Sequence, residues 1–427
     1  ILDNDNASLL HFFTAMKGEA AACYTNYRDS LEDHTYQVDT VDAKVAFLEA
    51  DLLASHYEML RSRQVTIVSM DQPGQDYPGV HYFWDLLAGV CDSNPNIVND
   101  DRSELSILRF TGGTTGRGKC AMYSADNWLM CRDSFFALPD PVWSPDCRML
   151  HLAPITHGSG MLVLPTLFKG GCTVTMNSPD LEAWCDHIAR ERINMVMMVP
   201  TLLYRLLAMD ESTPRRLASL ETVYYGAAPM SPSKLTDLQA AFGNIFVQIY
   251  GSTEHVGVAL SMSKADHLIA NFSDDAHLAS AGRPVAGVEV QIMDDDGNPV
   301  ARGETGEIWL RSRAICLGYF GSPEQTASEF QDGFWKSGDL GRMDERGFVY
   351  IVDRKKDMII SGGFNIYANE VESALNSHES VLMSAVVGIP HEEWGEAVHA
   401  EVMLKEGASA DCADLIEHVR AQLGGYK

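Results

Sequence analysis

Apolar residues along this chain gather in short runs that alternate with stretches of helical spacing. Near the start, Asn6 can cap a helix that carries Leu9 and Phe13 on one face and stops at Gly18. The runs that follow predict a strand at 43–48, a helix at about 51–63 and a strand at 65–68. Strand–helix alternation of this kind is typical of α/β architecture.

The same alternation continues through the middle of the chain. The pattern predicts strands at 107–110, 149–153, 172–176, 194–199, 222–225 and 245–250, and helices from 161, at 181–192 and at 233–242. The methionines of the 194–199 run are expected to pack in the core, because flexible thioethers fill apolar gaps well. We therefore expect a large domain in which helices and sheets lie in layers.

From about residue 282 the pattern changes to short β runs separated by turns. Such runs occur at 288–293, 306–311 and 348–353, and a helix from 369 with strands at 384–387 and 398–404 completes the chain. The last group predicts a small α+β unit. The expected division is a large N-terminal domain, residues 1–353, and a small C-terminal domain, residues 354–427, joined by the charged link Lys355-Lys356-Asp357.

Composition narrows the class of protein. The formal net charge of −27 over 427 residues disfavours binding to nucleic acid or to anionic membrane surfaces. Nine cysteines, with no C-x-x-C pair and no zinc-ligand spacing, indicate a reduced cytoplasmic protein rather than a disulfide framework. No signal peptide and no apolar stretch long enough to span a bilayer are evident. The expected partner is therefore a small molecule.

The run Thr111-Gly112-Gly113-Thr114-Thr115-Gly116-Arg117-Gly118-Lys119 directly follows the predicted strand at 107–110. Glycine lets backbone N–H groups face a ligand, and threonine hydroxyls and a lysine add donors, so the run suits a polyphosphate. From Gly113 it nearly matches the P-loop pattern G-x-x-x-x-G-K-[ST], but Cys120 stands where a hydroxyl should bind Mg²⁺. Taken alone, the run is equally compatible with a phosphate site and a surface turn.

Four further segments, in order, give the run a context. They are Tyr250-Gly251-Ser252-Thr253-Glu254, Phe334-Trp335-Lys336-Ser337-Gly338-Asp339, Asp353-Arg354-Lys355-Lys356-Asp357, and Gly362-Gly363-Phe364-Asn365-Ile366-Tyr367 followed by Glu370-Val371-Glu372. With the threonine-rich run, they resemble the motifs of the adenylate-forming superfamily, which contains acyl-CoA synthetases, luciferases and peptide-synthetase adenylation domains. The resemblance covers nearly the whole chain and is closest to the acyl- and aryl-CoA ligases. Gly118 and Ala368 stand where the family has proline, and Cys120 where it has glycine.

The resemblance implies an ATP site with Mg²⁺. Glu254, a carboxylate at a strand end, is expected to hold the metal ion, and Thr253 to donate to the α-phosphate. Asp339 is expected to accept hydrogen bonds from the ribose hydroxyls, with Arg354 beside it. The remaining expected contacts to ATP or AMP come from Thr111, Gly113, Thr114, Thr115, Gly116, Lys119, Gly226, Ala227, Ala228, Pro229, Tyr250, Gly251 and Ser252.

The resemblance also implies a carboxylic acid substrate and coenzyme A. His157 is expected to orient the reacting carboxylate, and no Asp between 154 and 160 is present to pair with an α-amino group. The expected acid pocket is lined by His157, Tyr225, Gly226, Gly251 and Val256. The acid would form acyl-AMP with release of pyrophosphate, and the coenzyme A thiol would then form the thioester.

In the family, the small domain rotates between these two steps. The resemblance places Lys356 at the pivot and brings Gly362, Gly363 and Phe364 to the pantetheine thiol. The family's adenylation lysine would follow a Y-K-x-P stretch, and the sequence ends at Tyr426-Lys427. A protein ending there is expected to form acyl-AMP poorly.

Other functions stay open at this point. An acyl-AMP ligase that loads a carrier protein, and a nucleotide-binding relative without activity, fit the same motifs. A P-loop kinase or NTPase fits only the run at 111–119, and release of ADP rather than AMP would identify it. A homodimer is compatible with the sequence.

Overall fold

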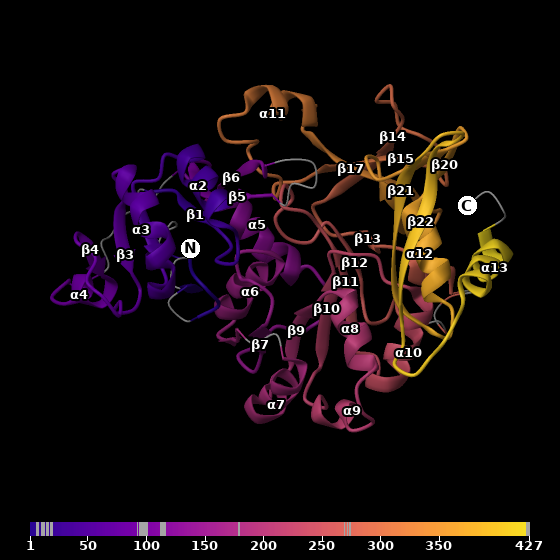
Figure 1. Ribbon diagram of the computed structural model, residues 1–427, viewed down its shortest axis with the longest axis horizontal. Coiled ribbons are helices and arrows are strands. Elements are labelled where there is room, and N and C mark those ends of the chain that lie inside the picture. Colours follow the sequence, from indigo (N-terminus) through magenta and orange to yellow (C-terminus); the bar gives the residue numbers. More distant parts are fainter. Residues whose placement is uncertain are drawn as a thin grey trace.

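A computed structural model describes residues 1–5, 8–9, 13, 17, 20–91, 93, 101–111, 117–177, 180–268, 270, 272 and 275–423. Figure 1 shows the N-terminal sheets on the left, a large sheet in the centre and the C-terminal sheet on the right. Ser8, Leu9, Phe13 and Lys17 are helical, and the rest of the helix expected from Asn6 to Gly18 lies outside the described residues. Among the described helices, none combines the length and the apolar character needed to cross a membrane.

Two small sheets form the N-terminal part. One has the order β2-β3-β4, with parallel neighbours, and the other the order β1-β5-β6. Their strands and accompanying helices are β1 (Ala22–Tyr24), α2 (Leu31–Thr40), β2 (Val45–Leu48), η1 (Ala50–Leu52), α3 (Leu53–Ser62), β3 (Thr66–Ser69), β4 (Val80–Tyr82), α4 (Phe83–Leu87), β5 (Leu105–Phe110) and β6 (Cys120–Ser124). β4 and α4 were not expected from the sequence, because each is too short to show a hydrophobic period.

The central sheet has seven strands in the order β13-β12-β11-β10-β9-β7-β8, parallel from β11 to β8. Its elements are α5 (Ala125–Phe136), β7 (Arg148–His151), η2 (Gly158–Leu162), α6 (Val163–Phe168), β8 (Cys172–Thr175), α7 (Leu181–Glu191), β9 (Met195–Met198), α8 (Pro200–Leu207), α9 (Thr213–Arg216), β10 (Thr222–Gly226), α10 (Pro232–Phe242), β11 (Phe246–Tyr250), β12 (Leu260–Met262), η4 (Ala276–Ala279) and β13 (Arg283–Pro284). The bounds of β7 to β11 and of α6, α7 and α10 agree with the predicted strands and helices to within a few residues. The elements α5, α8, α9, β12 and β13 had no counterpart in the prediction.

The strands β7, β9, β10 and β11 of the central sheet contribute side chains to two cores, because successive side chains point to opposite faces. In β10, Tyr224 packs with Trp128 of α5 and Val163 of α6 on one face. Val223 and Tyr225 pack on the other face with Trp184 of α7 and Leu235 of α10. Helices therefore cover both faces of the sheet, as α/β architecture requires, and the expected fold class is confirmed.

The last third of the chain forms two more sheets. The first joins β14 (Glu289–Met293), β15 (Gly306–Arg311), β17 (Phe334–Met343) and β16 (Phe330–Gln331), with β18 (Val349–Arg354) beside β17 and α11 (Pro323–Glu329) at the edge. The second has the order β20-β19-β22-β21 and packs on two helices. Its elements are β19 (Ile359–Ser361), β20 (Phe364–Ile366), α12 (Ala368–Asn376), β21 (Val381–His391), β22 (Gly395–Leu404) and α13 (Cys412–Leu423).

The segment around Gly362 and Gly363 forms a β-hairpin. Gly362 and Gly363 form its turn at φ +56° and +83°, in the left-handed region that glycine enters without steric cost, and β19 and β20 pair on either side. The hairpin escaped prediction because each strand has only three residues. The domain division at 353/354 stays a prediction; β18 ends at Arg354, just beyond it.

Candidate active site

The phosphate-type run joins β5 to β6, and the structure describes its two ends. Thr111 and Lys119 close the loop, since the Thr111 N–H donates to the Lys119 carbonyl (2.8 Å) and the Lys119 N–H donates to Thr111 Oγ1 (3.1 Å). A Cβ on Gly118 would lie 2.3 Å from the Thr111 carbonyl oxygen, so this close approach requires glycine. Cys120 begins β6 with its side chain buried, so its thiol packs in the core. The expected phosphate contacts at Gly113, Thr114, Thr115 and Gly116 lie outside the described residues.

Glu254 lies at the carboxyl end of the central sheet, just after β11. The Tyr123 hydroxyl, from β6, donates to the Thr253 carbonyl, and the Cys316 N–H donates to the Glu254 carbonyl (2.8 Å). The Glu254 carboxylate is buried, and its Oε1 lies 2.9 Å from the Tyr319 hydroxyl. Burial raises the pKa of Glu254, and the hydrogen bond to Tyr319 opposes that rise. β6, which directly follows the run at 111–119, and the Glu254 segment thus meet at the carboxyl end of the central sheet.

A second carboxylate stands on the far side of the same tyrosine. Glu329, the last residue of α11, places Oε2 2.6 Å from the Tyr319 hydroxyl and pairs through Oε1 with Lys119 Nζ at 2.5 Å. Lys119 Nζ also lies 4.9 Å from the centroid of the Tyr319 ring. Lys119 and Glu254 are therefore connected through Glu329 and Tyr319, neither of which was among the residues predicted for the site.

Asp339 occupies a buried position in β17, beside a tyrosine and an arginine. Its Oδ2 accepts from the Tyr250 hydroxyl (2.6 Å), and its Oδ1 lies 3.2 Å from Nε of Arg354 on β18. The pairing of β17 with β18 places Asp339 directly opposite Arg354. Burial raises the pKa of the Asp339 carboxyl, and Tyr250 and Arg354 oppose the rise. Asp339 and Arg354, expected at the ribose, and Tyr250, expected among the other contacts to ATP or AMP, therefore form one contact group.

The expected adenine loop follows β10. Gly226 is buried at the strand end, whereas Ala227, Ala228 and Pro229 are exposed. Ala227 has φ +64°, in the left-handed region that costs a residue with a Cβ about 1–2 kcal/mol. Such strain persists where tightly packed neighbours fix the backbone conformation, as they do at the adjacent, buried Gly226.

Glycine is also required in the Tyr250–Glu254 segment. A Cβ on Gly251 would lie 2.4 Å from the Gly257 carbonyl oxygen. The next residue, Ser252, uses its Oγ to accept from the His255 N–H at 3.0 Å. The backbone after β11 is therefore packed too closely to accept a side chain at Gly251.

His157 occupies the N-cap position of the short helix η2, makes no capping hydrogen bond with its side chain, and is exposed. Its Nε2 lies 3.5 Å from Asn26 Nδ2, and the Arg109 guanidinium donates to the neighbouring Thr156 carbonyl (2.6 Å). The imidazole ring of His157 reaches solvent, but many protein atoms surround it. This partial burial lowers the pKa of His157 below its ordinary value, and the positive charge of Arg109 lowers it further. A neutral imidazole can orient an anion by hydrogen bonding.

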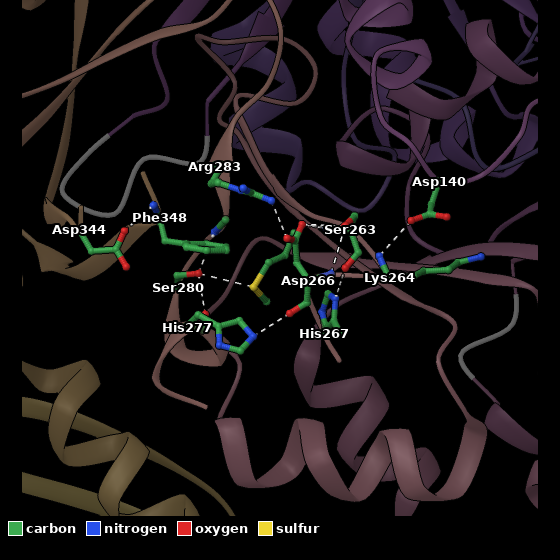
Figure 2. A network of polar contacts seen from close by, with 12 residues as sticks. Asp140, Ser263, Lys264, Asp266, His267, His277, Ser280, Arg283, Asp344 and Phe348 are labelled. Atoms are coloured by element: carbon green, nitrogen blue, oxygen red, sulfur yellow. Dashed lines mark hydrogen bonds and ion pairs between the residues drawn. The ribbon is translucent and has the colours of Figure 1, made fainter. Parts of the chain in front are cut away.

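Two residues expected to line the acid pocket are fully buried. Val256 packs in the core against α5 and α6. The Tyr225 hydroxyl lies 2.8 Å from His267 Nε2 and 3.0 Å from Gln248 Oε1. His267 is fixed in turn by the Ser263 carbonyl, and Figure 2 shows this contact within a network around Asp266. Burial lowers the pKa of His267 to about 4, so the imidazole ring stays neutral. The Tyr225 hydroxyl is thus already hydrogen-bonded to other protein side chains.

The residues expected to pivot the small domain and to bind coenzyme A lie on its surface. Lys356 is exposed in the turn after β18. Gly362 donates its N–H to the Trp394 carbonyl (2.9 Å), and the side chain of Phe364 is 59% exposed. The hairpin turn at Gly362 and Gly363 therefore contacts the turn between β21 and β22 in this arrangement.

Comparison with known proteins supplies the family. The sequence model described as AMP-binding enzyme matches residues 1–320, and the one described as AMP-binding enzyme C-terminal domain matches residues 370–427. The chain belongs to the AMP-binding enzyme family. The members of this adenylate-forming family that are similar to this chain include acyl- and aryl-CoA ligases, as the sequence motifs indicated.

Individual relatives of this AMP-binding enzyme act on different acids. The chain is 40% identical over 304 residues to the medium/long-chain-fatty-acid–CoA ligase FadD8 of Mycobacterium tuberculosis, covering 71% of this chain but only 52% of that ligase. It is 36% identical to the feruloyl-CoA synthase of an Amycolatopsis species, over 79% of this chain and 67% of the synthase. The chain thus spans between half and two thirds of the length of these two relatives.

Solved structures show the same architecture over the whole chain. ATP-bound MatB from Rhodopseudomonas palustris superimposes with a TM-score of 0.88 at 28% identity, over 100% of this chain and 82% of MatB. The amide bond synthetase McbA from Marinactinospora thermotolerans gives a TM-score of 0.87 at 29% identity, over 100% of this chain and 83% of McbA.

Asp339→Asn should separate stability from nucleotide binding in this AMP-binding enzyme. Because burial raises the pKa of Asp339, its contribution to stability is full below the unfolded-state pKa and is lost as pH rises through the folded-state pKa. At neutral pH the buried Asp339 carboxyl is ionised, and burying that charge destabilises the folded state. The asparagine variant, which has no such charge, should therefore melt at or above the wild-type temperature. Its affinity for AMP should fall about tenfold or more, since an anionic acceptor is lost. Melting curves at about pH 4 and pH 7, with AMP titrations, check both; a lower neutral-pH melting temperature would contradict the burial argument.

Proposed function

We propose that this chain activates a carboxylic acid with ATP, forming acyl-AMP and pyrophosphate, and then transfers the acyl group to coenzyme A. The observation that supports this most directly is the meeting of Lys119, at the end of the phosphate-type run, with the Glu254 segment around Tyr319. These segments are far apart in the sequence. Their contact creates a place where a cation and an acidic residue can act on one polyphosphate.

Each group has a chemical task in this proposal. Asp339 accepts from the ribose hydroxyls, with Arg354 beside it, and the Gly226–Pro229 loop lies against the adenine. Thr253 donates to the α-phosphate, and the loop ending at Lys119 holds the β- and γ-phosphates. His157 orients the acid so that a carboxylate oxygen can attack the α-phosphorus in line with the leaving pyrophosphate. The protein thus contributes alignment and neutralisation of charge.

The residues present fit a magnesium ion. Glu254 offers a buried carboxylate, and hard divalent cations of this kind take one or two protein carboxylates and complete their shell with water and substrate phosphates. When bound, Mg²⁺ would neutralise phosphate charge. Among the described residues, no cluster of three or more metal-ligating side chains is present.

For the acceptor and the acid, we propose coenzyme A and a fatty or aromatic acid without an α-amino group. The FadD8 ligase, the feruloyl-CoA synthase and an indoleacetate–CoA ligase of Aromatoleum aromaticum, 30% identical over 94% of this chain, support this choice by their names. In the second step Lys356 would serve as pivot, and Gly362, Gly363 and Phe364 would approach the thiol. All nine cysteines are free, which supports a reducing, cytoplasmic location.

The two half-reactions should be assayed separately. In the first, ATP, Mg²⁺ and a panel of acids should give acyl-AMP and pyrophosphate; release of ADP would overturn the proposal. In the second, a synthetic aryl- or acyl-adenylate is supplied with coenzyme A, so that the result does not depend on acyl-AMP formation by this chain. Acyl-CoA and AMP are the expected products. Transfer only to an added carrier protein would instead assign the carrier as acceptor, and transfer to neither would contradict the second step.

A further inference from the structure

Tyr319 stands between two carboxylates, and only one of them belongs to the expected ATP site. Its hydroxyl contacts Glu254 Oε1 at 2.9 Å and Glu329 Oε2 at 2.6 Å. The other oxygen of Glu329 pairs with Lys119. Lys119 therefore has an anionic partner within this chain, namely Glu329.

The segment that carries Tyr319 is hydrogen-bonded to β6, which follows Lys119, and to the main chain of Glu254. Its main chain pairs with β6, where the Met122 N–H donates to the Gly318 carbonyl (2.9 Å) and the Phe320 N–H donates to the Cys120 carbonyl (2.7 Å). Tyr319 itself is 2% exposed. The hydroxyl thus has a defined position, and through it Glu329 has one as well.

Glu329 is held by more than its ion pair. The helix α11 that ends at Glu329 is tied to Tyr319, because the Tyr319 N–H donates to Thr326 Oγ1 (2.9 Å). Gly318, at φ +121°, lets Thr326 approach: a Cβ there would lie 2.5 Å from Thr326 Cγ2. The side chains of Lys119 and Glu329 are 30% and 25% exposed, so the pair is partly shielded from water. These contacts distinguish the pair from a fully solvated surface ion pair.

The charges of this group conflict with its proposed ligand. Glu254, Glu329 and Lys119 carry two carboxylates and one ammonium at the place where a polyphosphate should bind. Lys119 can neutralise phosphate only by turning away from Glu329, and each phosphate oxygen competes with Glu329 for the same ammonium. The resting ion pair therefore opposes ATP binding.

We propose that Glu329 is a positioning residue that holds Lys119 against Tyr319 before ATP arrives, and that Lys119 exchanges Glu329 for phosphate oxygens when ATP binds. This inference rests on the proposed ATP site. Glu329 keeps Lys119, at the end of the phosphate-type loop, in place. When ATP binds, the Lys119 ammonium releases the Glu329 carboxylate and pairs with phosphate oxygens. AMP, which lacks the β- and γ-phosphates, does not require this exchange.

The test compares nucleotide affinities of single and double variants. Glu329→Gln keeps the shape of the side chain but removes its charge, so α,β-methylene-ATP with Mg²⁺ should bind roughly fivefold more tightly, the equivalent of about 1 kcal/mol for a half-buried pair. AMP affinity should not change. In a Lys119→Ala background, the same glutamine substitution should have little effect on the ATP analogue.

A matched control removes the same charge from the same helix. Glu324 lies in α11 and is exposed, so Glu324→Gln should leave the affinity for the ATP analogue unchanged. If Glu329→Gln weakens or does not alter binding of the analogue, or if its effect persists without Lys119, the exchange is wrong. If the wild-type protein binds neither nucleotide, the proposed ATP site itself fails, which is a separate result. Melting temperatures show whether any variant is merely unfolded.

Discussion

Replacing Glu254 by glutamine is expected to remove the dependence of nucleotide binding on Mg²⁺ and to lower acyl-AMP formation about 100-fold or more. The glutamine keeps an oxygen for the Tyr319 hydroxyl, so the contact that holds the side chain can persist. What is lost is the anionic ligand for a hard cation, which an amide oxygen replaces poorly. Titrations of α,β-methylene-ATP with and without Mg²⁺ measure the first effect, and pyrophosphate release measures the second.

The control for Glu254→Gln is Glu58→Gln, which makes the same change of charge at an exposed position of α3. It should behave as wild type in both titrations. If Glu254→Gln retains the full gain in affinity that Mg²⁺ gives the wild-type protein, the metal role assigned to Glu254 is wrong. Binding of AMP without Mg²⁺ should be similar in all three proteins, because the proposed contacts to AMP do not pass through the metal ion.

The periodicity of the chain was sufficient to predict the fold class. In β10, Val223, Tyr224 and Tyr225 alternate between two cores, and a fully apolar run of this length predicts a strand buried on both faces. The family assignment followed from five motifs in order, and the family match confirms it. Some elements were missed. The three residues of β19 or β20 cannot show a period, but the longer helices α2, α5 and α13 also had no counterpart in the prediction.

The composition of the candidate site was predictable only in part. Motifs single out residues that lie together in sequence, such as Thr253 with Glu254. They do not show that Glu329, at the end of a seven-residue helix, meets Lys119 across Tyr319. Such contacts depend on tertiary packing, here on the pairing of residues near Tyr319 with β6. The individual roles of the predicted site residues stay predictions.

Gly226 offers the sharpest test of how the fold supports the site. It ends β10 beside Ile249 of β11, and a Cβ there would lie 2.1 Å from the Ile249 carbonyl oxygen. Main-chain atoms in the middle of a sheet cannot move aside as a flexible side chain can. Gly226→Ala is therefore expected to cost about 3 kcal/mol, the upper part of the usual range for overpacking, and to lower the melting temperature by several degrees.

In the Gly226→Ala protein, the binding free energy for AMP should fall by more than the free energy of unfolding. The strand end that the methyl group displaces carries the expected adenine loop, and Ala227 already holds a strained backbone there. Gly74→Ala is the matched control, because that glycine is exposed and a Cβ meets nothing within 4 Å. Differential scanning calorimetry and AMP titration at a temperature where both variants are folded distinguish the two effects. Normal AMP affinity in folded Gly226→Ala would show that the loop after β10 does not contact the base, because a shift of that strand end has to move the loop with it.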